Sequence, residues 1–145
     1  MSMPNGCRRC CTCSTWRSTR ATRRAEAIAA IHAEAPSWEC TDWPQIVVLY
    51  RMLDRVAPSP VVTLNLGVAV GMAYGAAAGL AVVDPLLQAD AMCIRHRLHS
   101  VRAHLLEMAG RTDDARAAFA TAARLTSSTP EQRYLNRQVL RLTEE

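Results

Sequence analysis

The chain has 145 residues, half of them apolar, which is enough for one compact domain with a hydrophobic core. Its 17 basic residues are all Arg and give a net charge of +4, but residues 1–25 hold six Arg and no acid, whereas residues 26–145 hold 11 Arg and 13 acids. No stretch approaches the ~20 uncharged apolar residues of a membrane span or resembles a signal peptide, which argues against both and predicts a cytoplasmic protein.

Residues 1–24 form a leader rich in Cys and Arg, and we expect it to be disordered. Its four cysteines include a Cys-x-x-Cys pair at Cys7 and Cys10, but no second pair follows at the spacing of a zinc site. Its positive charge alone could attract nucleic acid, yet regular aromatic interleaving is lacking. The sequence therefore predicts no metal, no cofactor and no direct contact with DNA.

Two helices are predicted next. Residues 25–35 are rich in Ala and are followed by Pro36, which ends the first helix. The second should span residues 43–56, because Thr41 or Asp42 can cap it and apolar residues up to Val56 recur at helical spacing.

A third helix is predicted over residues 60–74, after the Pro58-Ser59-Pro60 break, with Gly75 ending it. Gly67 and Gly71 lie four residues apart on one face of this helix. Such spacing lets another helix approach closely, although each Gly costs about 1 kcal/mol relative to Ala in an exposed helix.

The rest of the chain also predicts helices, and no alternating strand pattern is present. They should span residues 76–83, 94–109 and 113–125, with a last helix after Pro130. The inner stripe of the second of these is expected to include Leu98, Val101, Leu105 and Met108.

Gly75 and Gly110 each precede an Ala-rich helix and lie 35 residues apart. That period is typical of helical-hairpin repeats, and the second copy fits the tetratricopeptide pattern, with Ala115 and Ala122 as small contacts and Phe119 as the filler. The predicted fold is all-α: residues 25–145 form a short right-handed α-solenoid that presents a groove to a peptide or a domain.

The candidate site residues are expected to pack the fold or to contact a partner. Trp38 and Trp43 flank the start of a helix together with Asp42, where packing is the favoured interpretation and partner binding the alternative. Asn65 lies in an apolar helix and should form a bond between helices rather than bind a ligand. His99 and Arg102 are the candidates on the 94–109 helix.

A catalytic or metal role is not expected on that helix. His96, His99 and His104 lack the i, i+4 pair of a helical zinc site. Ser100 and His104 lie at helical spacing, but no orienting carboxylate follows from the sequence.

Several collinear segments carry a family resemblance. They are AAIHAEAPSWECTDWPQIVVLY, RVAPSPVVTLN, GAAAGLAVVD, RLHSVRAHLLEMAG and RTDDARAAFATAARLT. Together they resemble the C-terminal extension of bacterial extracytoplasmic-function RNA polymerase sigma factors of the sigma-70 family. In that family the extension is tetratricopeptide-like and follows two promoter-reading domains.

The chain also departs from that family. It contains no region resembling the sigma domains that read the −10 and −35 elements, so by itself it is not expected to direct transcription. Asn65-Leu66-Gly67 stands where family members commonly have Asn-Arg-Ala, so the role of that Arg does not carry over.

The leader itself can be explained through the same family. Codons chosen for residues 10–23, when read in the neighbouring frame, encode Val-Leu-His-Val-Leu-Tyr-Leu-Ala-Phe-Asn-Glu-Gly-Tyr-Ala, which resembles the segment where the family's extension begins. Our hypothesis is that residues 1–24 are an out-of-frame translation joined to an in-frame remnant. An apolar segment in the shifted frame of the gene is the expected result.

The resemblance implies a non-catalytic regulatory or interaction domain of a sigma factor. Its expected partners are sigma domains or RNA polymerase, with self-association through an exposed end of the solenoid as a further expectation. The alternative is a free-standing helical-repeat adaptor for another protein.

Overall fold

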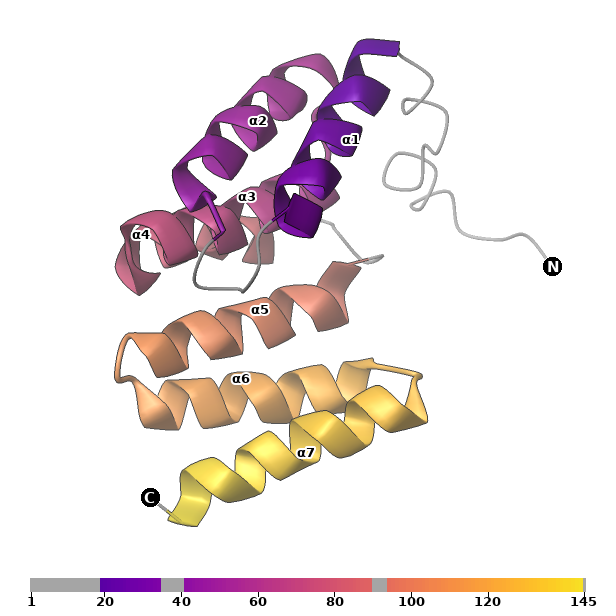
Figure 1. Ribbon diagram of the computed structural model, residues 1–145. Coiled ribbons are helices and arrows are strands. Elements are labelled where there is room, and N and C mark those ends of the chain that lie inside the picture. The colour runs from indigo at the N-terminus through magenta and orange to yellow at the C-terminus, as the bar shows by residue number, and fades with distance from the viewer. Residues whose placement is uncertain (1–18, 35–40, 90–93, 145) are drawn as a thin grey trace, which may run out of the picture.

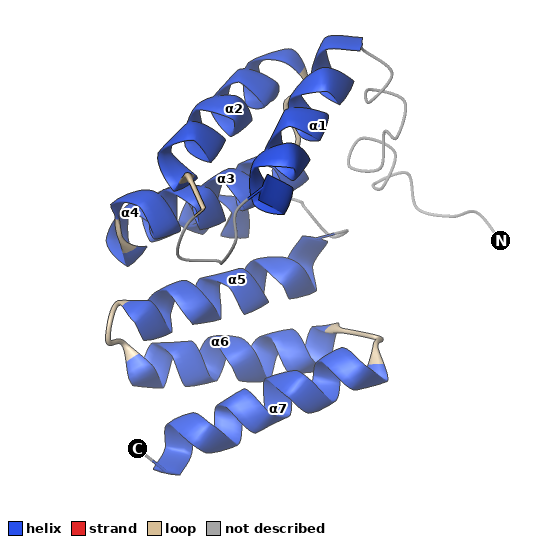
Figure 2. Ribbon diagram, in the orientation of Figure 1, coloured by secondary structure: helices blue, strands red, loops and turns tan. Residues whose placement is uncertain are grey.

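The computed structural model describes residues 19–34, 41–89 and 94–144, and within these ranges the chain is all-α with no strand (Figures 1 and 2). The predicted fold class is confirmed. The elements are α1 (Thr19–Glu34), α2 (Trp43–Val56), α3 (Pro60–Tyr74), α4 (Ala76–Val83), the short 3-10 helix η3 (Asp84–Leu87), α5 (Arg95–Met108), α6 (Thr112–Leu125) and α7 (Thr129–Glu144).

The start of α1 corrects the expected boundary of the leader. The helix begins at Thr19, six residues before the predicted start, so residues 19–24 are helical and not disordered. These residues include no Gly or Pro, and Arg and Ala favour helix, so nothing local stops α1 from extending backwards. Arg24 Nη1 donates a hydrogen bond to the Met52 carbonyl oxygen of α2 at 3.1 Å, which fixes this turn. Residues 1–18, with the leader cysteines, lie outside the described residues.

Local signals set the other helix ends as predicted. Ser59 caps α3, its Oγ accepting from the Val62 N–H at 3.3 Å, and Pro60 occupies the first turn. Gly75 ends α3 with φ +97°, and Gly110 follows α5 with φ +72°. Both angles lie in the region that favours glycine, so the two predicted glycine turns have a conformational cause.

Helices that follow one another in sequence also pack against one another, which is the arrangement of a helical-repeat stack. Figure 1 shows α5, α6 and α7 one above the other, with α1 to α4 on the opposite side of α5. The closest associations are the hairpins α3–α4 and α5–α6, which follow the predicted 35-residue period.

Small residues set the spacing inside each hairpin. Between α3 and α4, Gly79 faces Gly67 and Gly71: a Cβ added to Gly79 would lie 2.8 Å from the Gly71 Cα. The predicted close approach is therefore made by a third glycine on α4. In the second hairpin Ala115, Phe119 and Ala122 are fully buried, as the repeat pattern predicts.

The hydrophobic core has two parts that meet at α3 and α4. The N-terminal part is formed by α1, α2 and α3 around Ile46, Val47 and Leu53, and the C-terminal part by α3 to α7 around Phe119 and Leu106. No described helix is long and apolar enough to cross a membrane.

Candidate functional site

Asp42 and Trp43 act together at the start of α2. The Asp42 Oδ1 accepts a hydrogen bond from the Gln45 backbone N–H at 3.0 Å, which satisfies one of the unpaired donors of the first turn. Trp43 is buried in the N-terminal core with Ile28 and Ile46. Both residues therefore stabilise the fold at this point. Trp38, the other predicted candidate, lies outside the described residues.

Asn65 joins two helices. It lies half-buried on α3, and its side chain interacts with that of Tyr50 of α2. Burial raises the pKa of Tyr50, while the Asn65 side chain and the charge of Arg97 on α5 oppose that rise. Asn65 thus acts on a neighbouring helix, and the inter-helix hydrogen bond expected of it stays a prediction.

His99 and Arg102 lie on α5, where several arginines surround His99. Arg102 Nε pairs with Asp84 Oδ1 of η3 at 2.8 Å, which ties α5 to the end of the first hairpin. Partial burial lowers the pKa of His99, and the positive charges of Arg102, Arg95 and Arg124 lower it further. His99 is therefore held in its neutral form more strongly than an exposed histidine.

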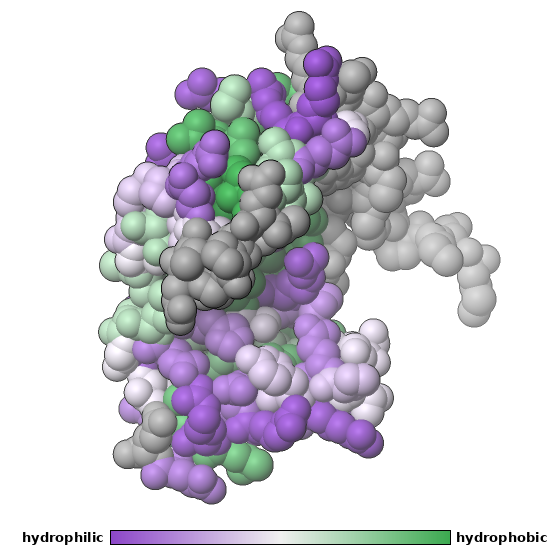
Figure 3. Space-filling model, in the orientation of Figure 1, coloured by the Kyte–Doolittle hydropathy of each residue, from purple (hydrophilic) through white to green (hydrophobic). Residues whose placement is uncertain are grey.

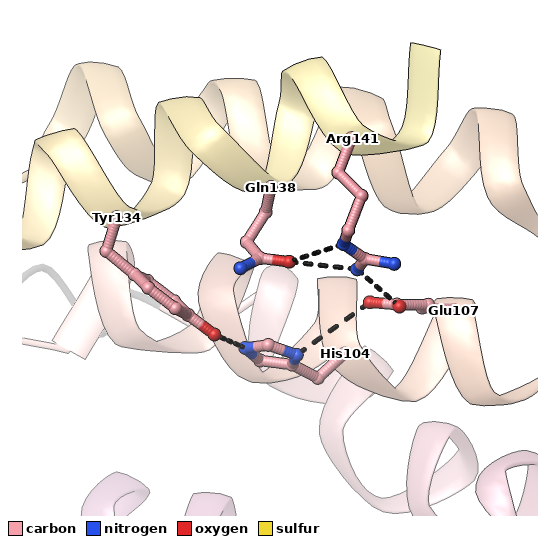
Figure 4. Close-up of polar contacts among 5 residues, drawn as sticks. All are labelled: His104, Glu107, Tyr134, Gln138 and Arg141. Carbon is pink, nitrogen blue, oxygen red and sulfur yellow. Dashed lines mark hydrogen bonds and ion pairs between the residues drawn. The ribbon is translucent and has the colours of Figure 1, made fainter. Parts of the chain in front are cut away.

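The most developed polar cluster lies between α5 and α7, and the predicted site residues are not part of it. Figure 4 shows side chains of α7 directed at side chains of α5. The Tyr134 hydroxyl lies 3.3 Å from His104 Nε2, and Arg141 Nη2 pairs with Glu107 Oε1 at 2.5 Å. Gln138 Oε1 accepts from Arg141 Nε at 3.1 Å. We call these five residues the α5–α7 cluster.

The protonation of His104 follows from its neighbours. Its ring meets Phe119 edge-on with centroids 4.8 Å apart, and burial lowers its pKa although Glu107 opposes the shift. Glu107 Oε2 lies 4.0 Å from Nδ1, and when a neutral ring carries its proton on Nδ1, its Nε2 accepts a hydrogen bond from the Tyr134 hydroxyl. The contacts from Tyr134 to His104 and from Arg141 to Glu107 hold α7 against α5.

The sequence missed most of this cluster. The sequence drew attention to Ser100 and His104 at helical spacing without predicting catalysis there, and no hydrogen bond joins these two described residues. One signal was available, since Glu107 follows His104 by three residues and shares its face. The sequence did not predict the roles of Tyr134 and Arg141. They lie on α7, 30 and 34 residues from their partners on α5, and α6 separates the two helices in the chain.

Other chemistry is sparse among the described residues. They hold no group of three or more His, Cys, Asp or Glu side chains placed to bind a metal ion. A shallow depression lies on the outer face of α7 and is lined only by residues of that helix: Pro130, Arg133, Asn136, Arg137 and Leu140.

Comparison with known proteins gives one informative similarity. No protein-family model matches the chain, and no solved structure matches it. The chain is 43% identical over 119 residues to "Uncharacterized protein R00370" of Rhizobium meliloti (strain 1021). The match covers 82% of this chain but 28% of that protein. The chain thus corresponds to less than a third of the length of its relative.

Proposed function

We propose that the chain is a non-catalytic interaction domain of an extracytoplasmic-function RNA polymerase sigma factor, serving transcription initiation or its regulation in the cytoplasm. The observation that carries the proposal is the match to 28% of a longer protein, which is the relation expected of one module to a multidomain chain. The resemblance of residues 25–143 to the C-terminal extension of these sigma factors favours a sigma factor as the longer chain.

The use of the polar side chains supports a role in binding rather than catalysis. Arg102 pairs with Asp84, Arg141 pairs with Glu107, and Tyr134 bonds to His104, and each contact joins two elements of the stack. A catalytic group needs a reactive atom directed at substrate. In this chain the polar groups of Arg102, Arg141 and Tyr134 instead bind side chains of neighbouring elements.

The partners would be the promoter-reading sigma domains or the polymerase itself. The charge of residues 26–145, with 11 Arg and 13 acids, favours contact with protein over contact with DNA. Stacked helical hairpins also present extended surfaces that bind other proteins.

Copurification tests the proposal. The full chain, carrying an affinity tag, is incubated separately with core RNA polymerase and with the isolated promoter-reading domains of a sigma factor that has this extension. An unrelated helical-repeat protein with the same tag is the control. We expect specific retention of at least one of the two partners by this chain alone.

If neither partner is retained, the proposal is contradicted. The alternative function, a free-standing helical-repeat adaptor, then remains. The genome provides an independent check, because sigma-domain coding sequence directly upstream is expected here and an isolated gene with its own promoter is expected of an adaptor.

A further inference from the structure

One helix exposes a row of apolar side chains. Val48, Met52 and Val56 follow one another at intervals of four residues on α2 and are 53%, 39% and 40% exposed. The opposite face of α2 is buried in the N-terminal core, so the exposed row is not a second side of that core. We call these three residues the α2 ridge. In Figure 3 hydrophobic residues reach the surface in the region where Figure 1 places α2.

The α2 ridge differs from the other exposed apolar residues. The remaining large ones in the described ranges are dispersed over several elements, as is normal on a protein surface: Tyr74, Leu87, Met108, Leu125, Tyr134 and Leu140. A row at i, i+4 and i+8 is the ridge that fits between the side chains of a second helix. The spacing therefore favours a helix as the occupant.

The charges beside the α2 ridge define that helix further. Arg51 and Arg55 alternate with the ridge residues and are exposed, and neither forms an ion pair with another described residue. Arg24 of α1 reaches the Met52 carbonyl oxygen. The neighbouring acid, Asp54, lies within 3.5 Å of the Thr63 hydroxyl of α3 and so points toward the core side of α2. The margin of the ridge is thus basic.

We propose that the α2 ridge binds an amphipathic helix whose apolar residues recur every four positions and are flanked by Asp or Glu. Carboxylates at those flanks would pair with Arg51 and Arg55, while the apolar row covers Met52. A second copy of this chain fits less well, since two ridges face to face would oppose Arg to Arg. This inference rests on the proposed function as an interaction domain and adds the surface and the chemistry of the partner.

A designed peptide pair tests the ridge. One helical peptide carries Leu at every fourth position with Glu on both sides, and its twin carries Lys in place of every Glu. Binding of each labelled peptide to the full chain is followed by fluorescence anisotropy. We expect the Glu peptide to bind at least about tenfold more tightly than the Lys peptide, and the R51E/R55E variant to reverse that preference.

Neutral substitutions separate the apolar contribution from charge. V48T/M52Q should weaken binding of the Glu peptide by about tenfold or more, whereas L140Q, at an apolar residue that is 63% exposed on α7, should leave it unchanged. All three residues are exposed, so unaltered thermal unfolding is expected and shows that the fold is intact.

Three results overturn the ridge inference: equal binding of the two peptides, binding unaffected by V48T/M52Q, or a dimer of the chain that V48T/M52Q dissociates. Its failure is distinguishable from failure of the proposed function. If the peptides fail but polymerase or sigma domains are retained, the ridge assignment alone is wrong. If the Glu peptide binds but neither partner is retained, the ridge stands and the sigma-factor assignment is wrong.

Discussion

At the scale of single residues, burial lowers the pKa values of His99 and His104 on α5 more than any neighbouring charge does. His104 lies against Phe119, and its pKa is lowered from 6.5 mainly by burial, although Glu107 pulls in the opposite direction. His99 is lowered by burial and by three arginines. Both rings therefore bind a proton less readily in the folded chain than in the unfolded chain.

This difference predicts a loss of stability in mild acid. The unfolded chain binds protons at these two histidines more tightly than the folded chain does. The free energy of unfolding should therefore fall as the pH is lowered through 6.5, the ordinary histidine pKa. Below the folded pKa values of the two histidines, they cause no further loss. Urea unfolding followed by circular dichroism between about pH 7.5 and about pH 5.5 measures the effect. The H99Q/H104Q variant should have a flatter dependence than the parent chain or L140Q. An unchanged slope in H99Q/H104Q would contradict this account.

At the scale of the elements, the α3–α4 hairpin depends on backbone contact. A Cβ on Gly79 would lie 2.8 Å from the Gly71 Cα and 2.9 Å from the Gly67 carbonyl oxygen, so backbone atoms would have to move. A Cβ on Gly71 would instead meet the Leu105 Cδ2, the end of a side chain that can rotate. The two glycines thus face neighbours of different stiffness.

Substitution by Ala separates these cases. Helix propensity alone would make G79A about 1 kcal/mol more stable, whereas overpacking costs about 1–3 kcal/mol or more when the neighbour cannot yield. We expect steric overlap to win, so G79A should lower the free energy of unfolding in urea by about 2 kcal/mol and G71A by clearly less. If G79A were as stable as the parent chain, the close approach of α3 and α4 would be wrong.

At the scale of the whole molecule, the two parts of the core suggest unequal responses to damage. Ile46 is fully buried in the N-terminal part and Phe119 in the C-terminal part, and each helix packs mainly on its sequence neighbours. In such stacks a lost contact is felt most by the adjoining helices.

Hydrogen exchange should resolve the two parts. I46A removes buried methyl groups at a cost of about 2–5 kcal/mol and should accelerate amide exchange in α1 and α2 more than in α6 and α7. F119L is the matched change in the other part and should show the reverse order. Equal acceleration throughout both halves in either variant would mean that the chain unfolds as one cooperative unit.

The helix boundaries could be predicted because they depend on neighbours within a few residues. Asp42 caps α2 through the N–H of Gln45, and Gly75 and Gly110 end helices at angles that glycine adopts easily. The start of α1 was wrong because residues 19–24 carry no local stop signal. Sequence periodicity also assigned Met108 to the inner stripe of its helix, yet it is 54% exposed.

By itself the sequence determined the all-α class, most helix ends and the hairpin period, since these follow from capping, glycine conformation and apolar spacing along the chain. The tertiary structure alone decided that Tyr134 meets His104, that Gly79 faces Gly71, and that Val48, Met52 and Val56 are uncovered. The class, the helix ends and the hairpin period depend on interactions between residues within about one helical turn of each other. The contacts between helices and the uncovered row on α2 depend on which helix faces meet when the hairpins stack. Periodicity along one helix does not specify its neighbour.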